Sequence, residues 1–233
     1  MNTPARRLRA HLHDPSGGLG YHLRAWRFRH TLWAPFVAAA RAWQRAWTPP
    51  ADELVIVGPS AGYTLDADFL ARFGTVHALE PDPLARWLLA RRFPAVRWCV
   101  GTLDCLADAH GPAALAADWP RAAVLFSNVL GQALEPSLLP AWRQAAGEAL
   151  RAHHWASYHD ALSAGHAPQC LASLPDPAAT PDTAALARAL WHGAPEVIDH
   201  DTFGLAPQNR QLACWRITPR RWQIVEWGCH APG

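Results

Sequence analysis

The sequence predicts an α/β protein with a doubly wound, mostly parallel sheet that ends in a C-terminal antiparallel hairpin. Three observations lead to this fold class. Short apolar segments alternate with helical segments from residue 53 onward, as in a parallel sheet with crossover helices. The first segment, ELVIVG, is almost uniformly apolar, as expected for a strand covered by helices on both faces. Two strand-like segments close the chain with only Pro219 and Arg220 between them, which is the length of a tight turn.

Residues 1–50 are expected to form a basic, tryptophan-rich helical arm that belongs to the same unit as the rest of the chain. We expect residues 1–15 to be a loose tail and SGGLG (Ser16 to Gly20) to be a flexible joint. Apolar side chains then recur every three or four residues up to Trp33, which predicts a helix that Pro35 interrupts. The arm has eight arginines and one aspartate. It could therefore bind an RNA or protein that serves as acceptor, or an anionic membrane surface, or its tryptophans could pack on the main domain.

Residues 51–233 are expected to form one Rossmann-like, cofactor-binding catalytic domain in which strands and helices alternate. Pro83 suits the first turn of a helix, where a missing N–H costs nothing. Residues 163–180 are rich in Pro, Ala and Ser and are expected to be a loop. The expected strands are 53–58, 75–80, 96–100, 122–128, 153–159, 211–218 and 221–228, and the expected helices are 64–73, 82–93, 136–152 and 183–192.

The composition excludes several enzyme classes and indicates a compartment. All 21 basic residues are arginines, so the chain lacks the lysine that Walker-type phosphate loops, Schiff-base aldolases and pyridoxal-phosphate enzymes require. The five cysteines are odd in number and include no C-x-x-C pair, which favours a reducing cytoplasm over a disulfide framework. We expect no signal peptide and no membrane span, because no uncharged apolar segment reaches about 18 residues.

The segment GPSAG (residues 58–62) after the first predicted strand has two interpretations. It matches the G-x-S-x-G nucleophile elbow of a serine hydrolase, with Ser60 as nucleophile. It also matches a glycine turn that lets a nucleotide approach backbone N–H groups. The hydrolase needs earlier strands and an oxyanion loop, and the preceding residues are instead predicted helical. Glu80 ends the second predicted strand 18 residues after Gly62, where an acid can bind ribose hydroxyls, and this favours the cofactor interpretation.

Three segments together resemble one enzyme family. VIVGPSAGYTL, VHALEPDPLAR and VLFSNVLGQ, in this order and spacing, are similar to the class I S-adenosylmethionine-dependent methyltransferases, and the similarity covers residues 53–160. The C-terminal hairpin is similar to the reversed last strand of that family. The resemblance implies a seven-stranded Rossmann-like sheet that holds S-adenosylmethionine across the carboxyl ends of its strands.

The resemblance also implies roles for individual residues. The turn at residues 58–62 would lie under the methionine part of the cofactor, and Glu80 would hold the ribose. Leu103 would pack on the adenine, and Asp104 would replace an aspartate missing at Thr102. Two positions depart from the family: Ile56 stands where an acid is usual, and Ser60 replaces the middle glycine. The expected cofactor-binding residues are Gly58, Pro59, Ser60, Gly62, Glu80, Leu103, Asp104, Ser127 and Asn128.

Two polar clusters are candidates for catalysis. YHD ends the fifth predicted strand and DHD precedes the hairpin, so His159, Asp160, His200 and Asp201 are expected to share one cleft. A histidine beside carboxylates can act as a general base. No ligand spacing indicates a metal site. Tyr21 and His22 of the arm could cover the cofactor or pack on the flank of the sheet.

The function that these features predict is methyl transfer to a small-molecule acceptor. The alternative from a different class is a non-catalytic protein of the same fold that binds a partner through its arm.

Overall fold

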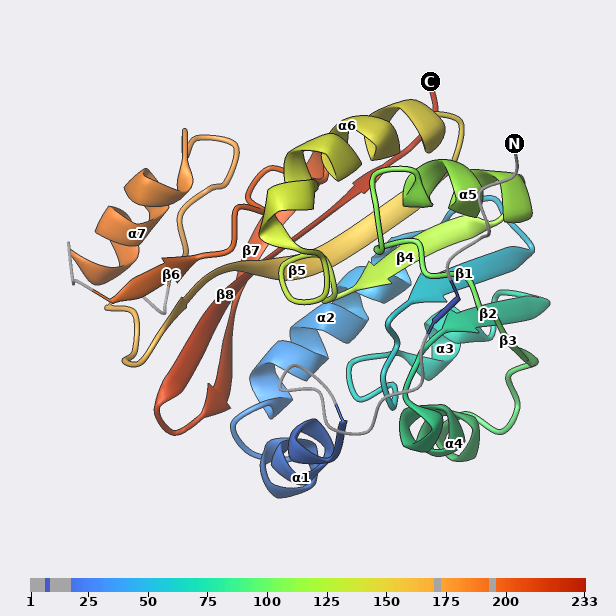
Figure 1. Ribbon diagram of the computed structural model, residues 1–233. Helices are drawn as coiled ribbons and strands as arrows, with labels where there is room; N and C mark the ends of the chain where they lie inside the picture. Colours follow the sequence, from blue (N-terminus) through green and yellow to red (C-terminus); the bar gives the residue numbers. More distant parts are fainter. Residues whose placement is uncertain (1–6, 9–17, 170–172, 193–195) are drawn as a thin grey trace.

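The computed structural model describes residues 7–8, 18–169, 173–192 and 196–233, and its centre is a mixed sheet (Figure 1). The strands are β1 (Glu53–Val57), β2 (Thr75–Leu79), β3 (Trp98–Val100), β4 (Ala123–Ser127), β5 (Trp155–Ala164), β6 (Val197–Asp199), β7 (Gln208–Thr218) and β8 (Arg221–His230). Seven of them lie in the order β3-β2-β1-β4-β5-β8-β7, and β6 pairs with β5. Strands β1 to β5 pair parallel, whereas β8 runs antiparallel to both β5 and β7. The described sheet therefore has eight strands, one more than the resemblance implied.

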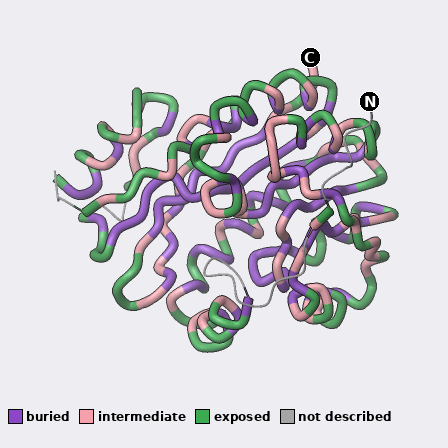
Figure 2. The backbone as a smooth tube through the Cα atoms, in the orientation of Figure 1, coloured by how far each residue is buried: buried purple, intermediate pink, exposed green. Residues whose placement is uncertain are grey.

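Helices cover both faces of this sheet. They are α1 (Gly18–Phe28), α2 (Ala34–Ala46), α3 (Ala67–Leu70), α4 (Pro83–Arg92), α5 (Gly111–Asp118), the 3₁₀ turn η1 (Pro136–Leu138), α6 (Leu139–Ala149) and α7 (Thr183–Trp191). Alternate side chains of each strand face opposite sides. Leu54 and Ile56 of β1 pack in the core beneath α2 and α3, while Val55 and Val57 pack in the core beneath α5 and α6. All four of these residues are buried, which explains why β1 is apolar after Glu53. Figure 2 shows that the strands at the centre of the sheet are mostly buried.

The helix boundaries follow from local chemistry. Asp66 accepts a hydrogen bond from the Phe69 N–H at the start of α3, and Asp82 accepts one from the Leu84 N–H at the start of α4. Such capping side chains satisfy N–H groups that have no partner inside the helix. The Asp66 cap places the start of α3 at Ala67, so this helix is shorter than the predicted 64–73.

The N-terminal arm packs on the last strands of the chain. The Trp33 and Trp215 rings meet edge to face with centroids 5.1 Å apart, and Phe36 stacks on Trp215 at 4.4 Å. The Trp33 indole N–H donates to the Ile217 carbonyl at 2.9 Å. Trp26 is 74% exposed, whereas the other three arm tryptophans are buried. These contacts make α2 part of the core.

Two expectations for the N-terminal segment need correction. Helix α1 already begins at Gly18, so Gly18 to Gly20 are helical and do not form a flexible joint. Most of the expected loose tail lies outside the described residues. The two residues of it that are described, Arg7 and Leu8, pair with the loop after β3: Arg7 bridges Leu103, and the Leu8 N–H donates to the Thr102 carbonyl at 2.9 Å.

Two elements, α5 and β6, were not predicted, and β5 extends beyond its predicted end. Helix α5 is alanine-rich and β6 has three residues, so neither carries a clear periodic pattern. Strand β5 continues to Ala164 through small and polar residues because β8 pairs with its whole length. Among the helices of the described residues, none has the length and apolar character needed to cross a membrane.

Candidate functional site

A cavity of about 820 Å³ lies at the carboxyl ends of β1, β2 and β4. The chain order of the strands reverses between β1 and β4, and ligands of open α/β sheets bind at such a switch point. The volume falls within the range of about 300–1,000 Å³ that is typical of small-molecule sites. Eight of the nine expected cofactor residues line this cavity: Gly58, Pro59, Ser60, Glu80, Leu103, Asp104, Ser127 and Asn128.

The turn after β1 has a backbone that requires glycine at two positions. Gly58, Ser60 and Gly62 have positive φ angles of 66°, 49° and 67°, a region that favours glycine. A Cβ atom on Gly58 would lie 2.0 Å from Val129 Cγ1. Gly62, the one expected cofactor residue outside the cavity lining, faces the core, where a Cβ atom would lie 2.6 Å from Phe93. Side chains thus pack tightly against both glycines, and Gly58, Pro59 and Ser60 line the cavity.

Glu80 connects this turn to the end of β2. Its Oε2 accepts a hydrogen bond from the Ser60 N–H at 2.8 Å, and its Oε1 accepts one from the Asp82 N–H at 2.9 Å. The side chain is buried and lines the cavity. Since each carboxylate oxygen offers about two acceptor positions, the carboxylate can hold the turn and still accept from a ligand hydroxyl.

Helix α1 is anchored beside the same cavity. The two ring nitrogens of buried His22 are hydrogen-bonded to the Tyr63 hydroxyl at 3.0 Å and to Asp82 Oδ2 at 3.1 Å. Tyr21 lines the cavity, and burial raises the pKa of its hydroxyl. This side chain therefore contributes an uncharged surface to the cavity. The arm thus supplies part of the enclosure, and His22 packs behind it.

A chain of hydroxyl groups forms the floor of the cavity near β4 and β5. The Tyr158 hydroxyl is hydrogen-bonded to Ser127 Oγ at 2.5 Å and to Thr64 Oγ1 at 2.6 Å, and burial raises its pKa. Asn128 follows with a φ of 57°, and its buried Oδ1 has no hydrogen-bond partner among the described residues. Tyr158 and Thr64 were not among the predicted site residues. The sequence could have indicated Tyr158, because it lies two residues before the candidate Asp160 and alternate side chains of a strand point to the same face.

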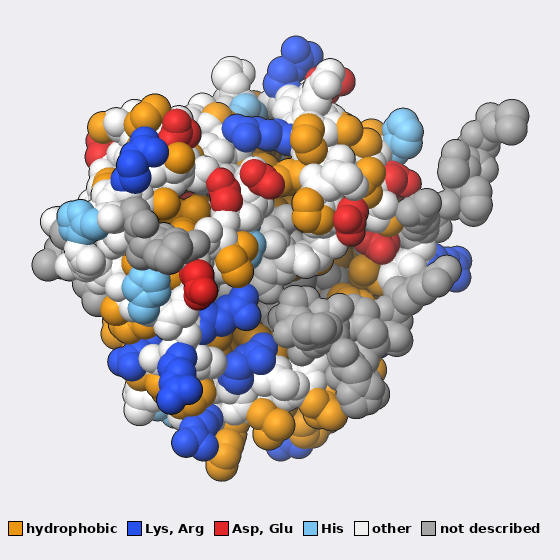
Figure 3. All heavy atoms as spheres, turned by 60° about the vertical axis from the view of Figure 1, so that its left-hand side comes forward, with side chains coloured by type: hydrophobic (Ala, Val, Ile, Leu, Met, Phe, Trp, Pro, Cys, Tyr) orange, Lys and Arg blue, Asp and Glu red, His pale blue; other side chains and the backbone are white. Residues whose placement is uncertain are grey.

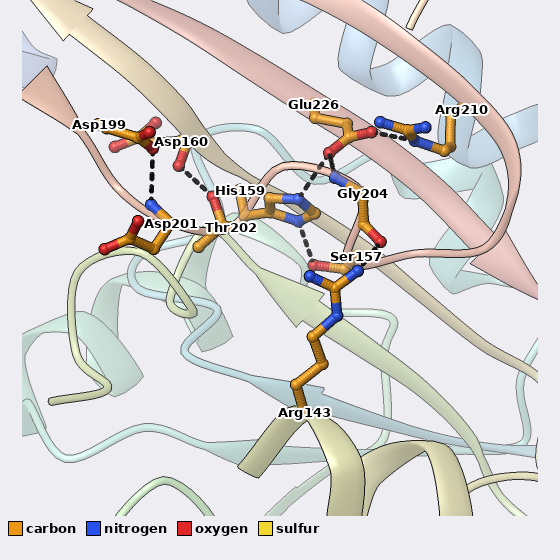
Figure 4. Close-up of polar contacts among 10 residues, drawn as sticks. All are labelled: Arg143, Ser157, His159, Asp160, Asp199, Asp201, Thr202, Gly204, Arg210 and Glu226. Atoms are coloured by element: carbon orange, nitrogen blue, oxygen red, sulfur yellow. Dashed lines mark hydrogen bonds and ion pairs between the residues drawn. The ribbon is translucent and has the colours of Figure 1, made fainter. Parts of the chain in front are cut away.

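His159 lies outside this cavity, in a buried ionic network on the α6 side of the sheet (Figure 4). Its Nε2 is hydrogen-bonded to Glu226 at 3.3 Å and its Nδ1 to Ser157 at 2.9 Å. Glu226 also accepts from Arg210 Nε and, at 2.6 Å, from the Gly204 N–H. Burial would raise the pKa of Glu226, but these three donors outweigh it and lower the pKa.

Asp160 points to the opposite face of β5, because neighbouring side chains of a strand alternate. Its Oδ2 accepts hydrogen bonds from the side-chain amides of Gln132 at 2.6 Å and Gln223 at 2.5 Å. Burial raises the pKa of this carboxyl, although the charge of His200 opposes the shift.

The expectation that all four catalytic candidates share one cleft is wrong, because His159 and Asp160 point to opposite faces of β5. His200 lies on the Asp160 side and is hydrogen-bonded to Ser163 Oγ at 3.1 Å. Asp201 is exposed, and its N–H donates to Asp199 at 2.8 Å. The structure thus brings Asp160 and His200 together and separates His159 and Asp201 from them.

The raised pKa of Asp160 predicts a pH-dependent stability. We expect Asp160→Asn to be more stable than the native protein at neutral pH by on the order of 1 kcal/mol, because the amide oxygen keeps both acceptor contacts without a buried charge. Above about pH 4 the unfolded chain releases this proton before the folded protein does. The native protein therefore loses stability relative to the variant as the pH rises through the raised pKa. Urea unfolding of both proteins between acidic and neutral pH tests this, and a difference that does not change with pH would contradict it.

Comparisons with known proteins give weak similarities to solved structures. No protein-family model matches the sequence, and no curated protein matches it significantly. An amino pentose methyltransferase from Micromonospora echinaspora, involved in calicheamicin biosynthesis, has 23% identity over 62% of this chain, with a TM-score of 0.36. This chain spans 58% of that protein, which is less than two thirds of its length.

Two further structures match more of the chain. A SAM-dependent methyltransferase from Anabaena variabilis has 14% identity over 82% of both chains, with a TM-score of 0.43. A complex described as DhpI-SAM-HEP has 14% identity over 91% of this chain and 94% of the other, with a TM-score of 0.44. Similarity at this level assigns no activity to the present chain.

Proposed function

We propose that this protein is an S-adenosylmethionine-dependent methyltransferase that acts on a small molecule. The observation that carries the proposal is the cavity at the switch point, bounded by the left-handed turn after β1 and by the Glu80 carboxylate that holds this turn. The reversed strand β8, which lies beyond β5 and runs antiparallel to both β5 and β7, is consistent with the family that the sequence resembles.

The cavity lining suits the parts of this cofactor in the order of the strands. Leu79 and Leu103, beside β2 and β3, provide apolar surface that would hold the adenine. Glu80 would accept hydrogen bonds from the ribose hydroxyls, and the turn after β1 would hold the methionine part. Ser127 and Asn128 at the end of β4 provide polar atoms on the other side of the turn.

When bound, S-adenosylmethionine supplies a methyl group already activated on a sulfonium sulfur. The chain then has to orient an acceptor and exclude water, and orientation alone lowers a reaction barrier substantially. Asp160 and His200 are the titratable groups that we assign to proton removal, because Asp160 lies on the face of β5 that carries Tyr158 and His200, after β6, interacts with Asp160. We assign His159 to holding β5 against β8, and Asp201 to the loop after β6. We also propose the cytoplasm as the compartment, since the four described cysteines are free thiols.

The test of this function is S-adenosylmethionine binding by Glu80 variants. We expect Glu80→Gln to lower the affinity about tenfold and Glu80→Ala about a hundredfold, since each hydrogen bond to a charged group contributes about 1.5–3 kcal/mol. Both variants should also lose some stability, because Glu80→Gln removes the acceptor of either the Ser60 or the Asp82 N–H group and Glu80→Ala removes the acceptors of both. Titration calorimetry measures the affinity, and urea unfolding shows that the variants remain folded.

Glu53→Gln is the matched control, because Glu53 is an exposed glutamate at the start of β1, away from the cavity. Its affinity should equal that of the native protein. An unchanged affinity in folded Glu80→Ala would overturn the assignment of Glu80. Failure of the native protein to bind millimolar S-adenosylmethionine would overturn the function and favour the partner-binding alternative.

A further inference from the structure

A second cavity of about 370 Å³ adjoins the first, between α1, the segment after β4 and the β7–β8 hairpin. The two cavities share four lining residues: Tyr21, Asn128, Gln132 and Trp215. Since Asn128 directly follows β4 at the switch point and lines both cavities, a molecule in the second cavity would lie next to a molecule in the first. Its volume admits a small molecule and excludes a folded partner.

Two guanidinium groups line the second cavity, and the buried Asp160 carboxyl, which interacts electrostatically with Arg221, lies outside this lining. Arg24 comes from α1 and Arg221 from the start of β8. Neither forms an ion pair within the described chain, and no described aspartate or glutamate lines the cavity. Burial and the charge of Arg221 lower the pKa of Arg24, so each charge disfavours the other. Figure 3 turns this end of the molecule forward and shows arginine side chains gathered on one region of the surface. An anion between the two guanidinium groups would relieve this repulsion.

Four buried polar atoms around the cavity have no hydrogen-bond partner within the described residues. Arg24 Nε and Trp215 Nε1 are donors, and Asn128 Oδ1 and Gln223 Oε1 are acceptors. Gln223 is only 3% exposed, and its amide nitrogen is already committed to Asp160. Buried polar groups are normally satisfied, so unpaired ones around a cavity indicate a ligand that pairs with them. Such a ligand has both acceptor and donor groups.

We propose that the second cavity binds the methyl acceptor, and that this acceptor is a small organic anion. A carboxylate or phosphate-type group would bind Arg24 and Arg221, and a hydroxyl or amine would donate to Asn128 and Gln223. Tyr21 and Trp215 provide aromatic walls for the carbon skeleton between these two ends. The identification of the ligand as the acceptor rests on the proposed function, whereas the binding of an anion does not.

The test measures anion binding to the protein without S-adenosylmethionine. The probes are 3-hydroxybenzoate for a carboxylate, phenyl phosphate for a phosphate ester, and neutral 3-hydroxybenzamide as the matched control. We expect at least one anion to bind with millimolar or tighter affinity by titration calorimetry at low salt, and the amide to bind at least about tenfold more weakly. The stronger of the two anions identifies the kind of anionic group.

Arg24→Gln and Arg221→Gln should each lower the anion affinity about tenfold. Arg27→Gln, at an exposed position of α1 outside both cavities, should leave it unchanged. If neither anion binds, or if the neutral amide binds equally well, the inference is wrong even when S-adenosylmethionine binds. If the anions bind and S-adenosylmethionine does not, the proposed function is wrong and the anion site stands.

Discussion

Replacing Glu226 by alanine is expected to destabilise the protein by about 3–5 kcal/mol, the range for removing one partner of a buried ion pair. Glu226 is fully buried and accepts hydrogen bonds from Arg210 and the Gly204 N–H while it pairs with His159. Without the carboxylate, the partly buried Arg210 guanidinium loses its counter-charge, and the His159 ring and the Gly204 N–H lose a hydrogen-bond partner. The free energy of unfolding in urea measures the loss.

Two further variants test whether this loss of stability comes from the buried carboxylate. Glu148→Ala removes an exposed glutamate of α6 whose described contact is Gln144, and it should change the stability by less than about 0.5 kcal/mol. Glu226→Gln keeps the shape and should lose its stability difference from the native protein in acid. In the unfolded chain the pKa of Glu226 is about 4.3, and in the folded protein it is lower. The charged carboxylate therefore stabilises the fold at pH values above about 4.3, and this contribution disappears as the pH falls through the pKa of the folded protein. A loss below about 1 kcal/mol for Glu226→Ala would contradict the assignment of the network as structural.

The second large effect is expected for Gly58→Ala. The new methyl group would collide with Val129, and a residue with a side chain would have to adopt a φ of 66°, which costs about 1–2 kcal/mol. The turn must shift to relieve the collision, and its backbone lines the cavity. We expect the affinity for S-adenosylmethionine to fall on the order of a hundredfold, measured by titration calorimetry.

Two glycine-to-alanine comparisons separate the causes. In the double variant Gly58→Ala/Val129→Ala the collision with Val129 Cγ1 is absent and the backbone strain remains, so part of the affinity should return. Gly147→Ala lies in α6, where a Cβ atom meets nothing within 4 Å, and it should stabilise the protein by about 0.4–1 kcal/mol without changing affinity. Equal affinities of Gly58→Ala and the native protein would show that the turn does not touch the cofactor.

The sequence predicts best those parts of the fold whose signals are local. The sequence predicts β1 because both faces of this strand are buried and its side chains are therefore apolar. It also predicts the start of α4, because Asp82 can cap a helix that has Pro83 in its first turn. Most of the expected cofactor residues converge because the carboxyl ends of parallel strands meet at one edge.

The remaining features depend on contacts between distant segments. His159 and Asp160 are neighbours in the sequence, and which of them faces a cavity depends on which helices cover each face of β5. Glu226, the partner of His159, is 67 residues away. The second cavity was not predicted for the same reason, because Arg24 and Gln223 meet only when α1 docks on the C-terminal hairpin.

The docking of α2 on the last strands also constrains how the chain can fold. The Trp33 indole bonds the Ile217 carbonyl across 184 residues, so the aromatic face of the arm is covered only when the end of the chain is in place. During synthesis the arm emerges before β7 and β8, on which it packs. Non-local closure of this kind slows folding and leaves apolar surface open to aggregation meanwhile. A chain that stops before β7 would leave Trp33 and Phe36 without their contact to Trp215, so the C-terminal hairpin completes the packing of the N-terminal helices.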